Sequence, residues 1–332
     1  MKFIDNKGIT DPRINLAIEE YALKQLPANE DYLLFYINEP SIIIGKNQNT
    51  IEEVNADYVA RQKLHVVRRL SGGGAVYHDL GNLNFSFITN DDGESFHNFR
   101  KFTQPVVDAL QEMGVNAELT GRNDIQVGER KISGNAQFST KGRMFSHGTL
   151  LFDSEIENVV SALKVNAEKI QSKGIKSIRS RVANISEFLP QRMTIEQFRE
   201  RLLSSIFGGG EVEEYKLSEQ DWDNIHQLSR ERYQNWEWNY GKSPKSNFRQ
   251  SKRFEGVGTI EVQLDIEKGK IANAKIYGDF FGVTDISELE ALLAQVPYEK
   301  ESVKTVLADA SLPTFFGNID TDSLLLLFFP ES

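Results

Sequence analysis

The feature that most constrains the fold is a run of three consecutive glycines, residues 72–74, held between two segments with strand-like patterns. The sequence LHVV at 64–67 is largely apolar, and NLNFSFIT at 82–89 alternates between polar and apolar residues. Alternation of this kind predicts a strand with one buried face. We therefore predict that the glycine run is a loop strung between strands of a buried sheet.

The residues of this loop have the chemistry of an anion-binding site. Gly72, Gly73 and Gly74 lack side chains, so they can adopt positive φ and let a ligand approach the backbone closely. N–H groups exposed in such a turn form a concave site for anions. Arg68 and Arg69 add positive charge, and a guanidinium binds a phosphate or carboxylate through two parallel hydrogen bonds. The alternative is a surface hairpin turn with charged flanks, which is the commoner role of an arbitrary SGGG sequence.

Helical and extended patterns alternate along the rest of the chain without a regular βαβ rhythm. Asp11 followed by Pro12 is a strong helix start and predicts a helix to about residue 26. We predict further helices at 99–114, 157–165 and 195–207, and strands at 32–37, at 41–45 and as short segments within 115–153. Several strands are joined by tight turns. This favours an α+β fold with a mixed, largely antiparallel sheet flanked by helices over a doubly wound parallel sheet.

The length of 332 residues is typical of about two domains. A polar stretch at 238–252 that contains Gly, Pro and several lysines predicts a linker, so we assign the domains to 1–240 and 253–332 with a linker at 241–252. The second domain is predicted to be a small α+β module. It combines a hairpin at 256–279 that turns at 267–270, helices at 286–296 and 301–310, and a buried strand in the apolar run at 324–330.

Composition narrows the classes of function. A net charge of −10 argues against a general nucleic-acid-binding protein, which presents a basic surface to the phosphates. The N-terminal segment lacks the apolar core of a signal peptide, and no stretch approaches the roughly 18 apolar residues of a membrane span. We expect a cytoplasmic protein without a nucleic-acid or membrane partner. The absence of cysteine excludes disulfides, thiolate metal sites and a cysteine nucleophile.

Four blocks of sequence together resemble the lipoate-protein ligase A family. In chain order they are RRLSGGGAVYHDLGN at 68–82, GRNDIQVGERKISGNAQ at 121–137, HGTLLFD at 147–153 and KGIKSIRSRVANI at 173–185. The likeness runs from about residue 15 to the C-terminal segment and covers nearly the whole chain. It implies a biotin/lipoate ligase-like catalytic domain at 1–240 that binds lipoate and ATP, and a C-terminal accessory domain at 253–332.

The resemblance implies an ATP-dependent lipoate-protein ligase. Such an enzyme activates lipoate to lipoyl-AMP with release of pyrophosphate, and then transfers the lipoyl group to a specific lysine of an apo lipoyl-carrier domain. ATP and Mg²⁺ are the implied cofactors. The implied partners are lipoyl domains of 2-oxoacid dehydrogenase E2 subunits, the glycine cleavage H protein, or both. Related octanoyl and lipoyl transferases carry the acyl group on a cysteine, a route that this cysteine-free chain cannot use.

Lys131 is the candidate catalytic residue. It lies in a predicted hairpin at 121–137 that turns at Gly128 and Glu129. A lysine at the edge of an anion cradle can stabilise the negative charge that develops during attack on the α-phosphorus of ATP. In an arbitrary hairpin the alternative is a solvated surface charge. In the family that the chain resembles, the matching lysine contacts both the lipoate carboxylate and the adenylate phosphate.

The motifs and the resemblance together predict two sets of binding residues. The residues expected to contact ATP or the adenylate are Arg69, Gly74, Ala75, Val76, Tyr77, Asn123, Asp124, Lys131 and Arg179. The residues expected to contact lipoate are Arg68, Leu70, Ser71, Gly72, Gly73, His78, Phe85 and Lys131. Because lipoate has a long apolar tail, Leu70, Val76, Tyr77 and Phe85 are the candidate lining of an apolar slot.

The sequence also predicts roles for an acidic residue, for a histidine and for a basic segment near the site. Asp124 is a candidate Mg²⁺ ligand, since Mg²⁺ prefers oxygen ligands and bridges ATP phosphates, whereas the alternative is an Asn-Asp turn before a strand. His78 and Asp79 are adjacent in an extended segment and point to opposite faces, so we interpret His78 as a wall residue or hydrogen-bond partner and not as a general base. The basic segment 173–181 is either a solvated helix face or a loop that closes over phosphate.

A second hypothesis belongs to a different functional class. The chain could keep the fold and bind lipoate or its adenylate as a sensor, without transferring the acyl group. The intact Lys131 and the arginines beside the glycine run argue against this hypothesis. Release of pyrophosphate from ATP and lipoate separates the two.

Overall fold

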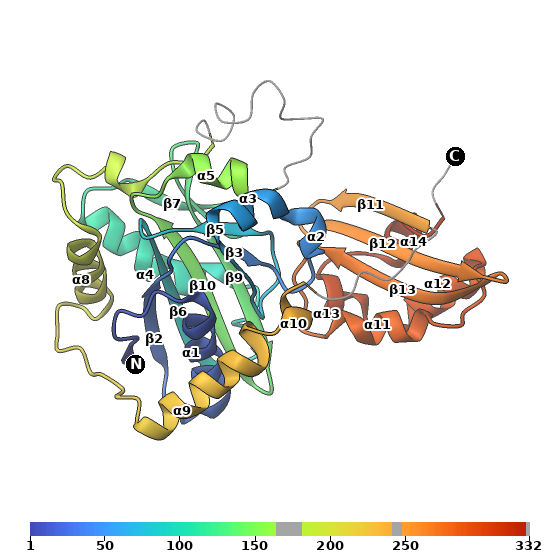
Figure 1. The fold of residues 1–332 in the computed structure, drawn as a ribbon, viewed down its shortest axis with the longest axis horizontal. Helices are drawn as coiled ribbons and strands as arrows, with labels where there is room; N and C mark the ends of the chain where they lie inside the picture. The colour runs from blue at the N-terminus through green and yellow to red at the C-terminus, as the bar shows by residue number, and fades with distance from the viewer. Residues whose placement is uncertain (164–180, 241–247, 330–332) are drawn as a thin grey trace. The chain divides into compact units, whose positions relative to one another are not determined.

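The structure is a computed structural model, and it describes residues 1–163, 181–240 and 248–329. The chain folds as two compact units, which Figure 1 shows as a ribbon. The first unit comprises Met1–Ile44, Ile51–Arg69 and Ala75–Asn239, and the second comprises Gly45–Thr50, Leu70–Gly74 and Tyr240–Ser332. Two short loops, one of them holding the glycine run, thus belong to the second unit, although the sequence analysis assigns all of 1–240 to one domain.

A seven-stranded sheet forms the centre of the first unit, in the order β1-β2-β6-β10-β9-β8-β7 (Figure 1). Its strands are β1 (Lys2–Asp5), β2 (Tyr32–Ile37), β6 (Asn82–Asn90), β7 (Ala117–Thr120), β8 (Asp124–Val127), β9 (Arg130–Thr140) and β10 (Arg143–Leu151). β1 and β2 are parallel, and every other neighbouring pair is antiparallel. The prediction of an α+β fold with a mixed, largely antiparallel sheet is confirmed.

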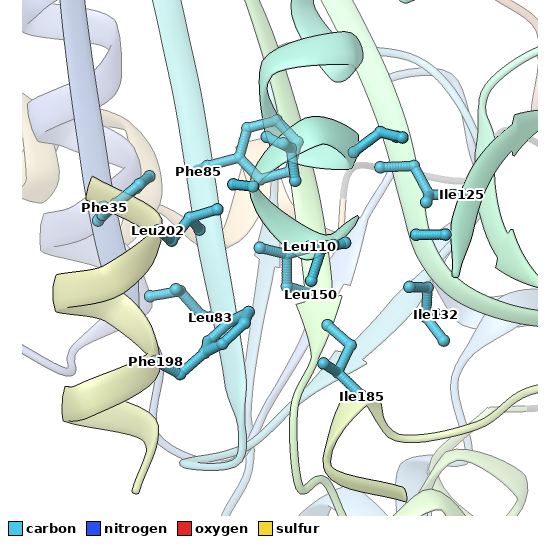
Figure 2. Close-up of a cluster of buried hydrophobic side chains, with 14 of the residues drawn as sticks. Phe35, Leu83, Phe85, Leu110, Ile125, Ile132, Leu150, Ile185, Phe198 and Leu202 are labelled. Atoms are coloured by element: carbon cyan, nitrogen blue, oxygen red, sulfur yellow. The ribbon is translucent and has the colours of Figure 1, made fainter. Parts of the chain in front are cut away.

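Helices α4 (Phe99–Glu112) and α8 (Ile195–Ile206) cover one face of this sheet. Figure 2 shows the core that they form, in which Leu110 of α4 and Phe198 of α8 pack with Phe85 of β6. Alternate residues of β6 point into this core because successive side chains of a strand face opposite sides. Phe85 is fully buried there. The structure therefore places Phe85 among the core side chains beneath α4 and α8, and not on the face where the other predicted site residues gather.

Helix α1 (Pro12–Gln25) covers the opposite face of the sheet. Asp11 caps the helix by accepting a hydrogen bond from the backbone N–H of Arg13, as the Asp-Pro sequence predicts. Glu19 of α1 contacts His147 of β10, with 2.9 Å between Oε1 and Nδ1. His147 points away from the α4 side, because its neighbour Gly148 is the residue directly opposite Phe85.

A second, three-stranded sheet carries the residues on either side of the glycine run. Its central strand β3 (Ser41–Ile44) is parallel to β4 (His65–Arg68) and antiparallel to β5 (Val76–His78). The glycine run connects β4 to β5, and β5 leads into β6 of the large sheet. The prediction of a loop strung between strands of a buried sheet is confirmed, because β4 and β5 are both strands of this small sheet, whereas the strand predicted at 82–89 is β6 of the large sheet.

The remaining elements of the first unit are short. They are α2 (Thr50–Glu53, which begins on the last residue of a second-unit loop), α3 (Ala56–Gln62), α5 (Ile156–Ala162), the 3₁₀ turn η1 (Ile185–Glu187), α9 (Glu219–Leu228), the π-helical turn η2 (Ser229–Tyr233) and α10 (Trp236–Asn239). Helix α9 and turn η2 pack along α1 (Figure 1). The Tyr233 hydroxyl donates to the buried Glu20 carboxylate at 2.8 Å, which ties this C-terminal part of the unit to α1.

The second unit is built on an antiparallel sheet of three strands, β11 (Phe248–Phe254), β12 (Gly258–Glu267) and β13 (Lys270–Gly278). Helices α11 (Ile286–Leu293), α12 (Lys300–Asp309), α13 (Leu312–Phe316) and α14 (Thr321–Leu325) complete its core. The predicted hairpin and the two predicted helices are present. β11 begins inside the stretch that the sequence analysis assigns to the linker, because a strand rich in Arg, Lys, Gln and Ser has no apolar alternation to reveal it.

The apolar run at 324–330 was expected to be a buried strand, and that expectation is wrong. Leu324 and Leu325 end helix α14, whose N-terminus is capped by the Asp320 side chain, while Leu327 and Phe328 are buried beyond it. A short apolar run fits either structure, and the capping aspartate decides for the helix. Among the described residues, no helix is long and apolar enough to cross a membrane.

Candidate active site

Lys131 and Asp124 meet on the hairpin of β8 and β9. β8 ends at Val127 and β9 begins at Arg130, so the predicted turn at residues 128 and 129 is confirmed. The Nζ atom of Lys131 lies 2.8 Å from Oδ1 of Asp124. Gly134 lies directly opposite Asp124, and a Cβ atom at Gly134 would approach Nζ of Lys131 to 3.0 Å. The glycine therefore leaves room for the lysine side chain to lie across the strand.

The strand register places this ion pair on the α1 face of the sheet. Gly134 donates its backbone N–H to Oγ1 of Thr149 in β10, and Thr149 lies opposite Asn84 of β6. Asn84 lies in turn opposite Tyr36 of β2. Because directly paired residues share a face, a polar row crosses the sheet from Asp124 to Tyr36. Phe85, the neighbour of Asn84, points to the other side.

The backbone of Lys131 is fixed by a separate segment. Its N–H donates to the carbonyl of Arg181 at 2.7 Å, and its carbonyl accepts from the N–H of Ala183 at 3.0 Å. These bonds pair β9 with the end of the basic block that the sequence analysis singled out. Arg179 and most of the segment 173–181 lie outside the described residues, so its predicted role as a closing loop stays a prediction.

Arg69 is a buried cation near the same face. Its Nη1 donates to the carbonyl of Ile43 at 3.2 Å, and burial lowers its pKa to about 10, with Tyr36 and Glu19 acting in the opposite direction. A pKa of about 10 still leaves the guanidinium charged at neutral pH. A buried positive charge of this kind favours an anionic ligand beside it.

Arg68, in contrast, is bound by main-chain carbonyls of the first unit's last helix. Its Nε donates to the carbonyl of Trp238 at 2.9 Å, and its Nη2 donates to the carbonyl of Asn239 at 3.2 Å. Its backbone N–H donates to Oδ1 of Asn239, and its carbonyl accepts from the Trp238 indole. Arg68 thus fastens the end of β4 to α10, an anchoring role that the lipoate-binding prediction did not include.

The glycine run itself is described within the second unit. Of the three glycines, Gly73 is the one with a positive φ, +88°, a conformation that the lack of a side chain permits. A Cβ atom at Gly72 would lie 2.3 Å from the carbonyl oxygen of Phe280, so a side chain is excluded there by protein packing. Gly74 has open space where its Cβ would stand. Leu70 and Ser71 are buried in this unit.

Residues 75–77 lead from the loop into β5. Val76 lies opposite Ile43 and Tyr77 opposite Ile42. Burial raises the pKa of Tyr77 to about 12, and its hydroxyl accepts a long hydrogen bond from Nδ2 of Asn158 at 3.4 Å. The predicted contact of the Gly74–Tyr77 backbone with the adenylate stays a prediction.

His78 and Asp79 have separate partners, as their adjacency in an extended segment predicts. Nδ1 of His78 lies 2.9 Å from Nδ2 of Asn38, in the interior of the first unit. Burial, together with Arg69 and His147, lowers the pKa of His78 to about 3. Asp79 instead accepts from the backbone N–H groups of Gly81 and Glu155, at 3.0 and 2.8 Å. His78 is therefore neutral at pH 7.

The sequence was compared with models of known protein families to establish the family of this chain. Residues 11–207 match the lipoyl protein ligase A/B catalytic domain family, and residues 243–328 match the bacterial lipoate protein ligase C-terminus family. The chain belongs to the lipoate-protein ligase family. A lipoate-protein ligase of Bacillus subtilis (strain 168) is 64% identical to this ligase over 332 residues, which cover 99% of this chain and 100% of the relative.

Solved structures agree with this assignment. A structure of Plasmodium falciparum LipL1 in complex with lipoate matches with a TM-score of 0.81 and 25% identity, covering 100% of this ligase and 99% of that chain. A lipoate-protein ligase A bound with ATP matches with a TM-score of 0.63 and 30% identity, covering 72% and 98%. A bipartite ligase from Thermoplasma acidophilum, solved as part of a study of the ligase and its E2 lipoyl domain, matches with a TM-score of 0.65 and 32% identity, covering 74% and 98%.

Asp124 is the single carboxylate that the described residues place beside Lys131, and within that part of the ligase no group of three or more His, Cys, Asp and Glu residues could hold a metal ion. Its neighbour Asn123 is engaged in the sheet, because its side-chain nitrogen donates to the carbonyl of Asn135. Mg²⁺ is commonly held by one or two carboxylates together with substrate phosphates. Asp124 therefore fits a magnesium ion that arrives with ATP, and not a preformed metal cage.

Two acidic residues of the ligase interior are not among the residues predicted from the sequence. Glu19 and Glu20 are almost completely buried on α1 and bind His147 and Tyr233 respectively. Two consecutive glutamates within the apolar sequence NLAIEEYAL could have been noticed, because a charged residue on the buried face of a helix requires a partner. The role of Trp238 and Asn239 in binding Arg68 has no such signal, since α10 is only four residues long.

Proposed function

We propose that this ligase activates lipoate with ATP to form lipoyl-AMP, releases pyrophosphate, and then transfers the lipoyl group to a specific lysine of an apo lipoyl domain. The observation that carries the proposal is the Lys131–Asp124 pair on the polar face of the large sheet, within a chain of the lipoate-protein ligase family. Relatives of known structure that bind ATP and lipoate support both substrates.

In the first step, a carboxylate oxygen of lipoate attacks the α-phosphorus of ATP, and the bond between that phosphorus and the pyrophosphate oxygen breaks. Negative charge gathers on the phosphoryl oxygens as the new bond forms. The ammonium of Lys131 is held by Asp124 and by the fixed backbone of β9, so it can meet this charge without reorganising. Arg69 and the backbone from Gly74 to Tyr77 complete the proposed adenylate contacts.

In the second step, the amine of the acceptor lysine attacks the carbonyl carbon of lipoyl-AMP. The bond from that carbon to the AMP oxygen breaks, AMP leaves, and the proton of the amine passes to water or to the departing phosphate. Lys131 stabilises the carbonyl oxygen during this attack. His78 takes no part as a base, because a group with a pKa of about 3 is too weak a base to deprotonate an alkyl ammonium at neutral pH.

Mg²⁺ and the acceptor are the remaining parts of the proposal. Asp124 is the residue that would hold Mg²⁺, and the ion would supply positive charge that neutralises the ATP phosphates. The proposed acceptors are lipoyl domains of 2-oxoacid dehydrogenase E2 subunits or the glycine cleavage H protein. The study of a bipartite relative together with its E2 lipoyl domain supports the first of these.

To test the proposed activity, the purified ligase is mixed with ATP, MgCl₂ and lipoate, and the release of pyrophosphate is measured. An apo lipoyl domain is then added, and its mass is measured by mass spectrometry. Pyrophosphate release that depends on lipoate, followed by a mass increase equal to one lipoyl group, is the expected result. Binding of lipoate without either product would identify the chain as a sensor and overturn the proposal.

A further inference from the structure

A continuous chain of side-chain amides leads through the interior of the first unit to His78. Nδ2 of Asn6 donates to Oδ1 of Asn15, and Nδ2 of Asn15 donates to Oδ1 of Asn38, each at 2.9 Å. Nδ2 of Asn38 then lies 2.9 Å from Nδ1 of His78. All four side chains are buried, and they come from the end of β1, from α1, from the turn after β2 and from β5.

Main-chain groups fix the direction of this chain. Nδ2 of Asn15 also donates to the carbonyl oxygens of Ile9 and Ile37, at 2.9 and 3.3 Å. Nδ2 of Asn6 likewise donates to Ile9, and its Oδ1 accepts from the backbone N–H of Gly8. A carbonyl oxygen only accepts and a backbone N–H only donates, so neither amide can be turned around. Oδ1 of Asn38 therefore faces Asn15, and its nitrogen faces His78.

This direction determines where His78 carries its proton. A side-chain amide nitrogen donates hydrogen bonds and does not accept them. Nδ1 of His78 must therefore accept from Asn38 and be unprotonated, which leaves the single proton of the neutral ring on Nε2. The amide chain thus selects one tautomer of His78 and points its other nitrogen, as a donor, away from Asn38.

The donor at Nε2 has no partner within the described residues, although it is buried. Ser41 lies directly opposite His78 in the small sheet, and its buried hydroxyl also has no partner there. An unsatisfied buried donor is costly, so such a group indicates an acceptor supplied by a bound molecule. Arg69 and His147 are the titratable groups that act on His78. The Arg69 cation makes an anionic acceptor the favoured one.

We propose that Asn6, Asn15 and Asn38 are positioning residues that lock His78 as its Nε2–H tautomer, so that Nε2 donates a hydrogen bond to a carboxylate oxygen of the acyl substrate beside Arg69. The inference rests on the proposed function for the identity of the substrate. It assigns His78 a contact with the carboxylate end of the substrate, and not only with an apolar wall.

Two matched substitutions test the donor. His78→Asn keeps an oxygen that can accept from Asn38 but removes the donor at the Nε2 position, whereas His78→Gln reaches that position with an amide nitrogen. A hydrogen bond to a charged group changes binding by roughly 10- to 100-fold. We expect His78→Asn to raise the KM for lipoate by that factor with kcat changed less than about threefold, and His78→Gln to stay near the parent. Equal KM values for both variants, raised or not, would overturn the proposal.

The tautomer is measured directly by NMR of protein labelled with ¹⁵N-histidine, with the partly exposed His226 as a reference signal. In the parent we expect an unprotonated Nδ1 and a protonated Nε2 for His78, and a shift of the Nε2–H signal when lipoate alone is added. In Asn38→Asp, whose carboxylate cannot donate, Nδ1 should gain a proton. A parent His78 protonated on Nδ1 would refute the inference even if no variant folded. Absence of pyrophosphate release with the expected tautomer would instead refute the proposed function.

Discussion

Replacing Lys131 with Met isolates the charge on which the proposed mechanism depends. Methionine keeps the length and the apolar stem but removes the ammonium that lies 2.8 Å from Asp124. Loss of one preorganised electrostatic partner costs about 3–4 kcal/mol in the transition state, or roughly a hundredfold to a thousandfold in rate. Because Lys131 would touch the phosphate in the first step and the carbonyl oxygen in the second, both half-reactions should slow.

The same substitution should hardly change stability. The side chains of Lys131 and Asp124 are 38% and 32% exposed, and ion pairs this accessible to water contribute about 0–1 kcal/mol. For a chain of this length, that corresponds to a fall in Tm of less than about 4 °C. Lys101→Met is the matched control, because Lys101 pairs with Asp92 at 3.1 Å on the surface of the same unit. It should lose its ion pair and keep the parent rate.

The assay measures pyrophosphate release for the first half-reaction and transfer from presynthesised lipoyl-AMP for the second. Asp124→Asn, made alone and together with Lys131→Met, completes a double-mutant cycle. If Asp124 acts only by holding Lys131, the double variant should be no slower than Lys131→Met. If Asp124 also holds Mg²⁺, its variants should require more Mg²⁺. If Lys131→Met keeps rates within about threefold of the parent in both half-reactions, Lys131 is a solvated surface charge and not a catalytic residue.

Three further predictions follow from the loop, the domain division and the buried histidine. Gly73→Val should weaken lipoyl-AMP binding at least tenfold with the fold retained, since φ is +88° there; calorimetric titration measures this, and parent-like affinity would exclude the loop from the site. A chain ending at Asn239 should fold but lose pyrophosphate release, because the glycine run packs against Phe280 in the second unit; full activity would contradict this. The His78 pKa of about 3 is below its unfolded value of roughly 6.5, so the folded state binds fewer protons between these values and loses stability as pH falls, by up to about 1.4 kcal/mol per pH unit. Urea unfolding from pH 6.5 to 4 should show a flatter pH dependence for His78→Asn, and identical slopes would show that His78 titrates normally.

Sequence patterns predicted the elements whose signals are local. The Asp-Pro cap predicted α1, and a glycine in a two-residue turn predicted the β8–β9 hairpin that joins Lys131 to Asp124. The packing of a side chain against distant elements could not be predicted in this way. Phe85 has the alternation of a strand, but alternation does not say which of two buried faces holds a substrate.

Two other sets of contacts could not be predicted for the same reason. The sequence around Arg68 suggests an anion-binding residue. Its hydrogen bonds to Trp238 and Asn239, about 170 residues away, cannot be predicted from the local sequence. The hydrogen-bonded row of side-chain amides that leads to His78 cannot be predicted from the sequence for the same reason, because its members come from four separate segments. Capping and turn chemistry can be read from neighbouring residues, whereas hydrogen bonds between distant segments require the fold.

The second unit is assembled from three stretches of chain, because the loops Gly45–Thr50 and Leu70–Gly74 fold with the C-terminal part. The carbonyl of Gly73 occupies the space of a side chain at Gly45, and the carbonyl of Phe280 occupies that at Gly72. A single crossover near residue 240 therefore cannot exchange the whole unit by recombination, because two of its three stretches lie upstream of that point. A chimaera joined there would combine the two loops of one parent protein with the C-terminal sheet of another. To keep the packing of the unit, natural recombination and laboratory shuffling must both transfer all three stretches together.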